Sequence, residues 1–225
     1  GLFYNRIEPG ITYDTIRLDG KNRREILINQ PAFFPYVPAE FSGTTSHFST
    51  LRKKAANLNA PYLIISTISY ERQLPWKMLG SANYTWQRGI HLLRTRNINS
   101  PLPGTGLRPF PDLGQVLQFE STGLSTRHDL RLTLRTSISR KLSLFGSYTL
   151  ASIKTDTEGP YSTPADTYNL SNEFARASSD DRHRFFMGGS ISLPGNLRFS
   201  PFLSISSGRP FNITTGHDNN GDALF

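Results

Sequence analysis

Cysteine is absent from this 225-residue chain, and so are long apolar runs. Without cysteine there is no disulfide framework, no thiolate metal site and no cysteine nucleophile. The longest unbroken apolar run is Tyr62–Ile65, whereas a membrane-spanning helix needs about 20 apolar residues. The sequence therefore excludes a disulfide scaffold and a bundle of membrane helices.

Acidic residues are fewer than basic ones. Asp and Glu total 17 against 25 Lys and Arg, which gives a net charge of +8. The basic residues are dispersed, in pairs such as Arg23-Arg24 and Lys53-Lys54. A nucleic-acid surface usually carries a denser cluster. We therefore expect no nucleic-acid partner.

Catalytic and zinc-binding motifs are also missing. No Gly-x-Ser-x-Gly segment marks a hydrolase nucleophile. The five histidines include no His-x-x-x-His pair of the kind that holds zinc. We expect that the protein is not an enzyme and uses no catalytic cofactor.

What the sequence does contain is alternation of apolar and polar residues, which is the signature of β-strands. In Leu130–Arg135 every second residue is leucine and the others are Arg or Thr. Similar segments flank short breaks near residues 75, 140 and 195, and this predicts three hairpins. The predicted apolar faces carry Ile64, Ile68, Tyr70, Leu74, Met78, Ala82, Tyr84 and Trp86, then Leu130, Leu132, Leu134, Leu142, Leu144, Tyr148 and Leu150, then Phe185, Met187, Ile191, Leu193, Leu197, Phe199, Leu203 and Ile205.

Long loops rich in Gly, Pro, Ser and Asp separate these hairpins, at residues 19–59, 99–114 and 155–181. The strands would thus have short turns at one end and long loops at the other. Outer-membrane β-barrels show this asymmetry, with short periplasmic turns and long extracellular loops. One short helix, over Ser49–Leu58, is the only helical pattern that we find.

The strand length favours a membrane barrel over a soluble β-rich binding module. Soluble strands average about 5–6 residues, whereas these segments run to about 12–15, enough to cross a bilayer at a tilt. We predict an all-β fold of antiparallel, up-and-down transmembrane β-barrel strands. The candidates for an interfacial aromatic girdle are Tyr62, Tyr70, Trp76, Tyr84, Trp86 and Tyr148.

Strand counting gives about seven strands, one near residues 1–18 and two around each tight turn. Single-chain bacterial barrels normally have an even number of strands, and closure leaves no open edge. The chain is therefore interpreted as part of a larger barrel. The alternative is a structural subunit that self-assembles through its open β-edges.

Five segments together resemble one family. They are Glu71-Arg-Gln-Leu-Pro-Trp76, Leu92-Leu-Arg-Thr-Arg-Asn-Ile-Asn-Ser-Pro101, Leu144-Phe-Gly-Ser-Tyr-Thr-Leu150, Asp181-Arg-His-Arg184 and Ser207-Gly-Arg-Pro-Phe-Asn-Ile-Thr-Thr-Gly216. In order and spacing they are similar to the barrel of TonB-dependent outer-membrane receptors. The resemblance is to the large Oar-like type, which carries a carboxypeptidase-regulatory-like domain.

The resemblance implies a barrel of about 22 strands around a plug, located in the bacterial outer membrane. It implies uptake of a bulky substrate of unknown class, with energy supplied through the TonB complex. The expected partners are outer-membrane lipid, the rest of the barrel, the plug and TonB. Residues 1–225 would be a partial barrel without the plug or the N-terminal domain.

Two candidate sites follow from the residues. Asp218, Asn220 and Asp222 place oxygen ligands at alternate positions, as at the opening of a calcium loop, although Ala223 replaces the usual glycine. The alternative is a polar loop tip without a metal. Ca²⁺ is the metal that the pattern would suit. On the polar faces of the strands, Arg131, Arg135 and Arg198 are candidates for lining a lumen and attracting anionic groups.

Overall fold

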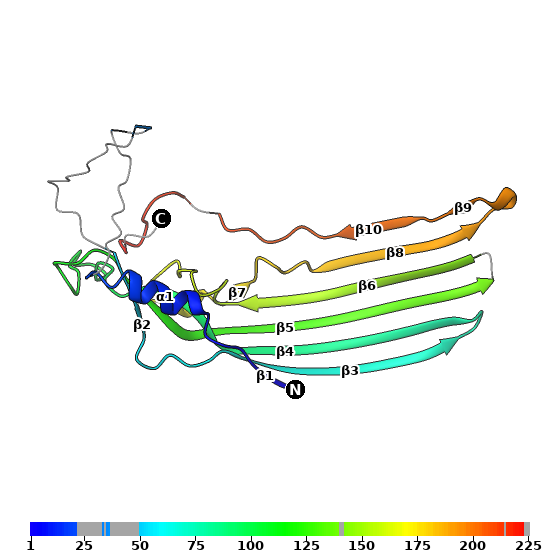
Figure 1. Ribbon diagram of the computed structural model, residues 1–225, viewed down its shortest axis with the longest axis horizontal. Coiled ribbons are helices and arrows are strands. Elements are labelled where there is room, and N and C mark those ends of the chain that lie inside the picture. The colour runs from blue at the N-terminus through cyan, green and yellow to red at the C-terminus, as the bar shows by residue number, and fades with distance from the viewer. Residues whose placement is uncertain (22–32, 34, 37–49, 140–141, 214, 223–225) are drawn as a thin grey trace.

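The computed structural model describes residues 1–21, 33, 35–36, 50–139, 142–213 and 215–222. These residues form an all-β, ten-stranded sheet with little helix (Figure 1). Its main path is β1-β3-β4-β5-β6-β8-β10, with antiparallel neighbours throughout. The strands are β1 (Leu2–Tyr4), β2 (Leu51–Lys54), β3 (Tyr62–Leu74), β4 (Met78–Asn97), β5 (Val116–Ser139), β6 (Leu142–Thr155), β7 (Ala175–Arg176), β8 (His183–Ser192), β9 (Arg198–Phe199) and β10 (Phe202–Ser206). The helices are α1 (Pro9–Arg17) and two short 3-10 turns, Leu170–Asn172 and Pro194–Asn196.

The seven strands of the main path agree with the predicted number, and all three predicted hairpins form. The turn between β3 and β4 contains Pro75, with Trp76 and Lys77 at positive φ. Gly195 and Asn196 take positive φ after β8, as turn residues do. The middle turn, Arg140-Lys141, lies outside the described residues, but β5 and β6 pair as far as Ser139 and Leu142.

Two predictions for the N-terminal part were wrong. Residues 1–18 form a three-residue strand followed by α1, since Pro9 at its first turn presets the helical φ. The helix predicted over Ser49–Leu58 is replaced by β2, while Ser49 itself lies outside the described residues. β2 pairs in parallel with residues 116–119 of β5. The hydrogen bonds offered by that edge override the weak helical pattern.

β4 and β5 are much longer than a membrane strand requires. They have 20 and 24 residues, whereas about 9–11 tilted residues span a bilayer. At the loop end β2 pairs with the edge of β5, and α1 packs against the paired extension. There Ile11, Leu93 and Phe119 form a small buried core, with Ile7 and Leu58 packed against it.

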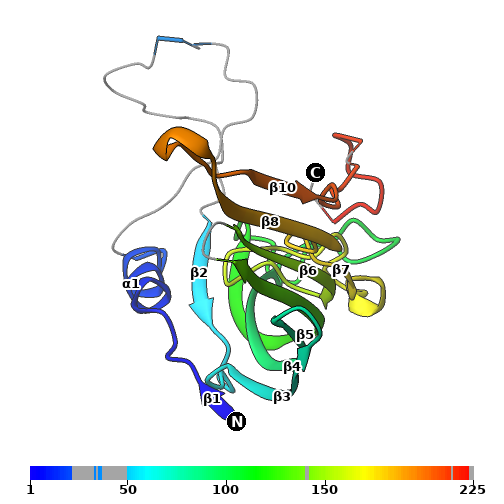
Figure 2. The ribbon, with the colours of Figure 1, turned by 90° about the vertical axis from the view of Figure 1, so that its right-hand side faces the viewer.

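The sheet is bent into an open trough, with α1 and β2 on its concave side (Figure 2). Its order ends at β1 on one side and β10 on the other, so the described sheet does not close. Among the described residues, no helix is long and apolar enough to cross a membrane.

Candidate functional site

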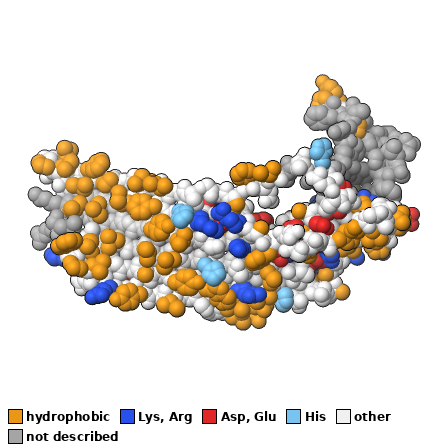
Figure 3. Space-filling model, turned by 180° about the vertical axis from the view of Figure 1, so that it is seen from behind, with side chains coloured by type: hydrophobic (Ala, Val, Ile, Leu, Met, Phe, Trp, Pro, Cys, Tyr) orange, Lys and Arg blue, Asp and Glu red, His pale blue; other side chains and the backbone are white. Residues whose placement is uncertain are grey.

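The pairing register separates the side chains of the sheet into two faces of opposite character. Residues directly opposite each other in antiparallel strands share a face. Leu132 is level with Ala82 on β4 and Tyr148 on β6. All three residues were predicted to lie on the apolar face. One convex face carries the apolar rows, and it is covered by hydrophobic side chains from the turn end to about its middle (Figure 3).

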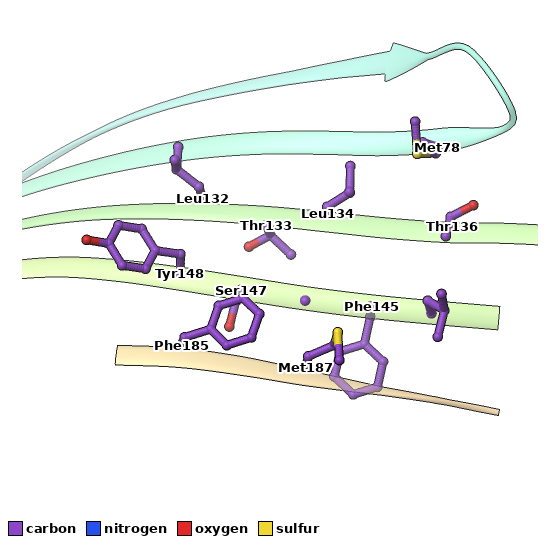
Figure 4. A pocket seen from close by; sticks show the side chains of 12 residues that line it. Met78, Leu132, Thr133, Leu134, Thr136, Phe145, Ser147, Tyr148, Phe185 and Met187 are labelled. Carbon is purple, nitrogen blue, oxygen red and sulfur yellow. The ribbon is translucent and has the colours of Figure 1, made fainter. Parts of the chain in front are cut away.

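The apolar face contains a shallow pocket of about 600 Å³ near the turn end. Gly146 leaves space between the side chains of Leu134 and Met187, which occupy the same row. The lining comes from β4, β5, β6 and β8 (Figure 4). An exposed apolar surface of this extent is what a lipid-facing barrel wall presents.

Towards the loop end, the apolar face is bordered by paired tyrosine and histidine side chains. The Tyr84 hydroxyl and His128 Nδ1 are joined by a hydrogen bond of 2.8 Å. Tyr148 and His183 repeat the pair at 2.7 Å, with nearly stacked rings. Trp86 lies level with His128 on this face. Tyr84, Trp86 and Tyr148 were among the residues predicted for an aromatic girdle.

The concave face is mainly polar. Arg131 is level with Asn83 and Thr149, and Thr133 of the next concave row is level with Ser81. Arg131 and Arg135 are exposed. In the part of the chain that the structure describes, neither side chain takes part in an ion pair or hydrogen bond. Two guanidinium groups thus point into the trough with their donors available.

Arg198 is not close to the other two arginines. It lies on β9, level with Ser192 at the turn end of β8. Pairing places its row on the same face as Arg131 and Arg135, but β6 and β8 separate it from β5. The three arginines therefore do not form one cluster.

An aromatic cluster on the concave face went unnoticed in the sequence. Phe145 and Phe186 have ring centroids 5.4 Å apart, and Phe186 and Phe202 are 5.2 Å apart. Gly188 makes room for it, because a Cβ there would lie 2.9 Å from Phe145 Cζ. The sequence does contain a signal for this cluster. Phe145, Phe186 and Phe202 are apolar residues at positions that alternation assigns to the polar face.

At the loop end, the 99–114 loop is held by one buried amide. The Asn99 side chain donates to the carbonyls of Phe110, Leu113 and Gly114 at 2.7–3.0 Å. Its Oδ1 accepts the Phe110 N–H at 2.7 Å. The side-chain oxygen of Asn97 accepts the backbone N–H groups of Asn99 and Val116. The loop is thus ordered from within.

A buried carboxylate holds the segment between β7 and β8. Asp180 accepts hydrogen bonds from Arg176 Nε at 2.7 Å and from the Ile153 N–H at 3.0 Å. Burial opposes ionisation of Asp180, but these hydrogen bonds and the charge of Arg182 outweigh it and lower its pKa. Asp181, beside it, has a lowered pKa because Arg209 donates two hydrogen bonds to its carboxylate.

In the calcium-like segment, Asp218–Asp222, the side-chain oxygens mostly accept hydrogen bonds from backbone N–H groups. Asp218 Oδ1 accepts the N–H groups of Gly221 and Asp222, and Asp222 Oδ2 accepts the Thr167 N–H at 3.1 Å. The Asn220 amide donates to the Ala165 carbonyl. Within the described ranges, no group of three His, Cys, Asp or Glu side chains could hold a metal ion. Calcium binding stays a prediction.

Comparison with known proteins agrees with the two-faced sheet. A family profile described as outer membrane beta barrel domain matches residues 4–224. The outer membrane transporter YddB from Escherichia coli is similar in structure, with a TM-score of 0.54 and 12% sequence identity. The match covers 73% of this chain and 23% of that chain, so the chain spans about a quarter of the transporter. No curated protein matches the sequence. The chain therefore belongs to the outer membrane beta barrel family and is a protein of the bacterial outer membrane.

Proposed function

We propose that this chain forms part of the wall of a larger outer-membrane transporter barrel that takes up a bulky substrate. The observation that carries the proposal is the separation of faces, apolar at Leu132 and polar at the adjacent Arg131 and Thr133. A wall between lipid and a hydrated passage requires this pattern. The likeness in fold to the Escherichia coli transporter supports it. The proposal assigns no catalytic step to the chain.

In this proposal the concave face lines the passage. Arg131 and Arg135 supply free guanidinium donors that would attract anionic groups on a substrate or on a plug. The cluster of Phe145, Phe186 and Phe202 gives the passage an apolar patch near the turn end. A plug within the barrel is the natural partner of such a patch, because exposed aromatic clusters usually mark contact surfaces.

Energy from TonB and membership of the Oar-like type are also proposed, on the five sequence segments. One of them, Asp181–Arg184, lies at the loop end of β8, where Asp181 is tied to Arg209 of another segment, Ser207–Gly216. Two of the five segments are thus joined in the fold. This contact supports reading them as one structural unit.

Maleimide labelling of single cysteines tests which face of the sheet contacts lipid and which contacts water. Because the chain lacks cysteine, single substitutions Arg131→Cys and Leu132→Cys can be compared in the full-length protein in its native membrane. A water-soluble maleimide should label position 131 and spare position 132, and a lipid-soluble maleimide should show the opposite preference. Equal labelling of both positions by the water-soluble reagent would overturn the wall assignment.

Transport needs its own test. Uptake of oligosaccharides, peptides and metal chelates would be measured in wild-type cells, in cells without the protein and in cells without TonB. We expect one substrate class whose uptake is lost in both deletions. Uptake that depends on the protein and persists without TonB would exclude TonB-driven transport and leave passive passage.

Open β-edges support a second candidate, a subunit that assembles with copies of itself. The described sheet ends at β1 and β10, and unpaired edges are templates for further strands. Stoichiometry separates the candidates. One polypeptide per barrel is expected for the transporter, and several identical copies per barrel would favour self-assembly.

A further inference from the structure

Basic side chains gather on the convex face just beyond the apolar rows, on the loop side of the Tyr–His pairs. One row contains Arg88, Thr126, Lys154 and Arg176, which the register places level across β4, β5, β6 and β7. Arg88 and Lys154 are exposed. Among the described residues, neither has an ion-pair or hydrogen-bond partner. Figure 3 shows basic and histidine side chains across the middle of this face.

Arg182 lies on the β8 side of this row, where its backbone carbonyl accepts the Ala151 N–H, three residues nearer the turns than Lys154. It shares the single carboxylate of Asp180 with Arg176, at 3.5 and 2.7 Å. One negative charge therefore faces two positive ones, and Asp180 is itself fully buried. The side chain of Arg182 remains 41% exposed. The convex face thus has surplus positive charge at this level.

A hollow of about 390 Å³ lies directly below these cations. Its upper lining is Arg182, His128 and Ser152, and its lower lining is Leu130 and Leu150. In the next row, Leu132 and Tyr148 line the larger apolar pocket nearer the turns. The two hollows adjoin along β5 and β6. From His128 to Thr136 they cover about 27 Å of strand at the usual rise per residue.

We propose that this surface binds an outer-leaflet lipid with a phosphorylated headgroup. The phosphate would lie on Arg182 and Lys154, with His128 beside it, and an acyl chain would follow the apolar groove past Leu130 and Leu132. Charge complementarity selects an anionic group, because guanidinium and ammonium donors form strong charge-assisted hydrogen bonds with phosphate oxygens. The groove selects an acyl-bearing molecule over a free ion.

The position in the membrane agrees with this occupant. Long loops of outer-membrane barrels face outwards, so the basic row lies at the outer headgroup level and the apolar groove lies in the hydrocarbon region below it. The inference rests on the membrane location of the wall. It does not depend on TonB or on a substrate, so failed transport experiments would leave it standing.

Lipid retention gives the test. The full-length protein would be placed in phosphatidylcholine nanodiscs that contain bisphosphorylated lipid A or its dephosphorylated form, and retained lipid counted by native mass spectrometry after transfer to detergent. We expect the phosphorylated form to be retained preferentially. The double substitution Lys154→Gln/Arg182→Gln should lower its retention about ten-fold.

The matched control removes two positive charges from the other end of the same sheet. Arg72 lies on the convex face, level with Gly80, and Lys77 lies in the adjoining turn. Arg72→Gln/Lys77→Gln should leave retention unchanged. The proposal would be overturned by an equal loss of phosphorylated lipid in this control, or by equal retention of the dephosphorylated lipid. It would also be overturned if inorganic phosphate displaced the lipid, which would indicate a site for the free ion.

Folding is checked separately by heat-modifiable electrophoretic mobility. Arg182 contacts Asp180, so its replacement also affects the β7–β8 segment. If the double variant does not fold, Arg88→Gln/Lys154→Gln takes its place, since these two side chains make no hydrogen bond within the described residues. A smaller loss of phosphorylated lipid is expected, because Lys154 is one of the two proposed phosphate contacts, and unchanged retention would refute the proposal.

Discussion

Tyr84 on β4 and His128 on β5 are joined by a side-chain hydrogen bond of 2.8 Å, and Tyr148 and His183 form the same pair between β6 and β8. The partners are not directly opposite, because Tyr84 pairs with Leu130 and Tyr148 with Phe185. Each bond is therefore diagonal, and it ties one row of the sheet to the next at the border of the apolar face.

Loss of these diagonal bonds should have a small effect that is specific to the paired tyrosines. Tyr84→Phe and Tyr148→Phe should each lower the free energy of unfolding by at most about 1 kcal/mol, since Tyr84 is exposed, Tyr148 is only half-buried and the ring remains. Tyr70→Phe is the control, because Tyr70 is on the same face without such a bond in the described structure. Urea unfolding in lipid vesicles measures the three. An equal effect at Tyr70 would contradict the assignment.

A charge placed on the two faces should have opposite consequences. Leu132→Arg puts a guanidinium on the lipid-facing surface and should cost about 2–4 kcal/mol of stability in vesicles. Thr133→Arg puts it among Ser81 and Ser147 on the concave face and should cost much less. Unfolding titrations of both variants measure the difference. Similar losses would mean that both faces contact lipid.

Acid should loosen the segment around Asp180. The folded pKa of Asp180 lies below its ordinary value of 3.8, so its stabilisation is fully present above that value and is lost as pH falls through the folded pKa. Asp180→Asn at pH 7 should cost about 1–3 kcal/mol locally, because Arg176 loses its charged partner. Asp112→Asn, at an exposed position, is the control. Protease sensitivity of residues 175–182 from pH 7 to pH 2 is compared between wild type and the two variants, and a wild-type segment whose sensitivity does not rise below pH 3.8 would contradict this expectation.

The 99–114 loop should lose its order without the Asn99 amide. Asn99→Ala leaves three carbonyls and one N–H without their partner, and each such buried group costs about 1–3 kcal/mol. Hydrogen exchange within 100–114 should rise at least about ten-fold, while β3 is unaffected. Asn57→Ala, at an exposed position, serves as control. Unchanged exchange at Phe110 would show that other contacts hold the loop.

A side chain at Gly189 should disturb the pairing of β6 with β8. A Cβ there would lie 2.5 Å from Leu144 Cδ2 and 2.7 Å from the Ser143 carbonyl oxygen. The backbone contact cannot be relieved by a rotamer change, so Gly189→Ala should cost about 1–3 kcal/mol. Gly208→Ala, where a Cβ has open space, is the control. Thermal unfolding compares them, and equal melting temperatures would contradict the close approach.

The strands and their faces were predictable because each depends on local alternation. The six residues Leu130–Arg135 alternate between apolar and polar, and their pairing with β4 and β6 confirms that the leucines share one face. The β2–β5 pairing was not predictable, since it joins Leu51 to Val116 in parallel and depends on where β6 leaves the edge of β5. The full length of β4 and β5 was missed for the same reason, whereas α1 was missed although Pro9 at its start is a local signal.

The candidate sites also include a part that local alternation predicts and a part that depends on strand order. Alternation was enough to put Arg131 and Arg135 on one face, but it could not show that Arg198 lies apart from them, which depends on the order of the strands. The Phe145 cluster and the basic row with Lys154 are each assembled from several strands. Such contacts depend on the pairing register, which single segments do not encode.

The length of β5 places a long distance between the loop end of the sheet and Arg131 on the concave face. Leu117, level with Asn97 beneath the ordered loop, is about 45 Å along the strand from Arg131 at the usual rise per residue. In the transporter that we propose, a substrate shorter than this distance would have to leave the outer loops before it reaches Arg131, so capture and translocation would have separate kinetics. Loop mutations would then alter how often a substrate enters, and substitutions at Arg131 or Arg135 would alter how fast it leaves.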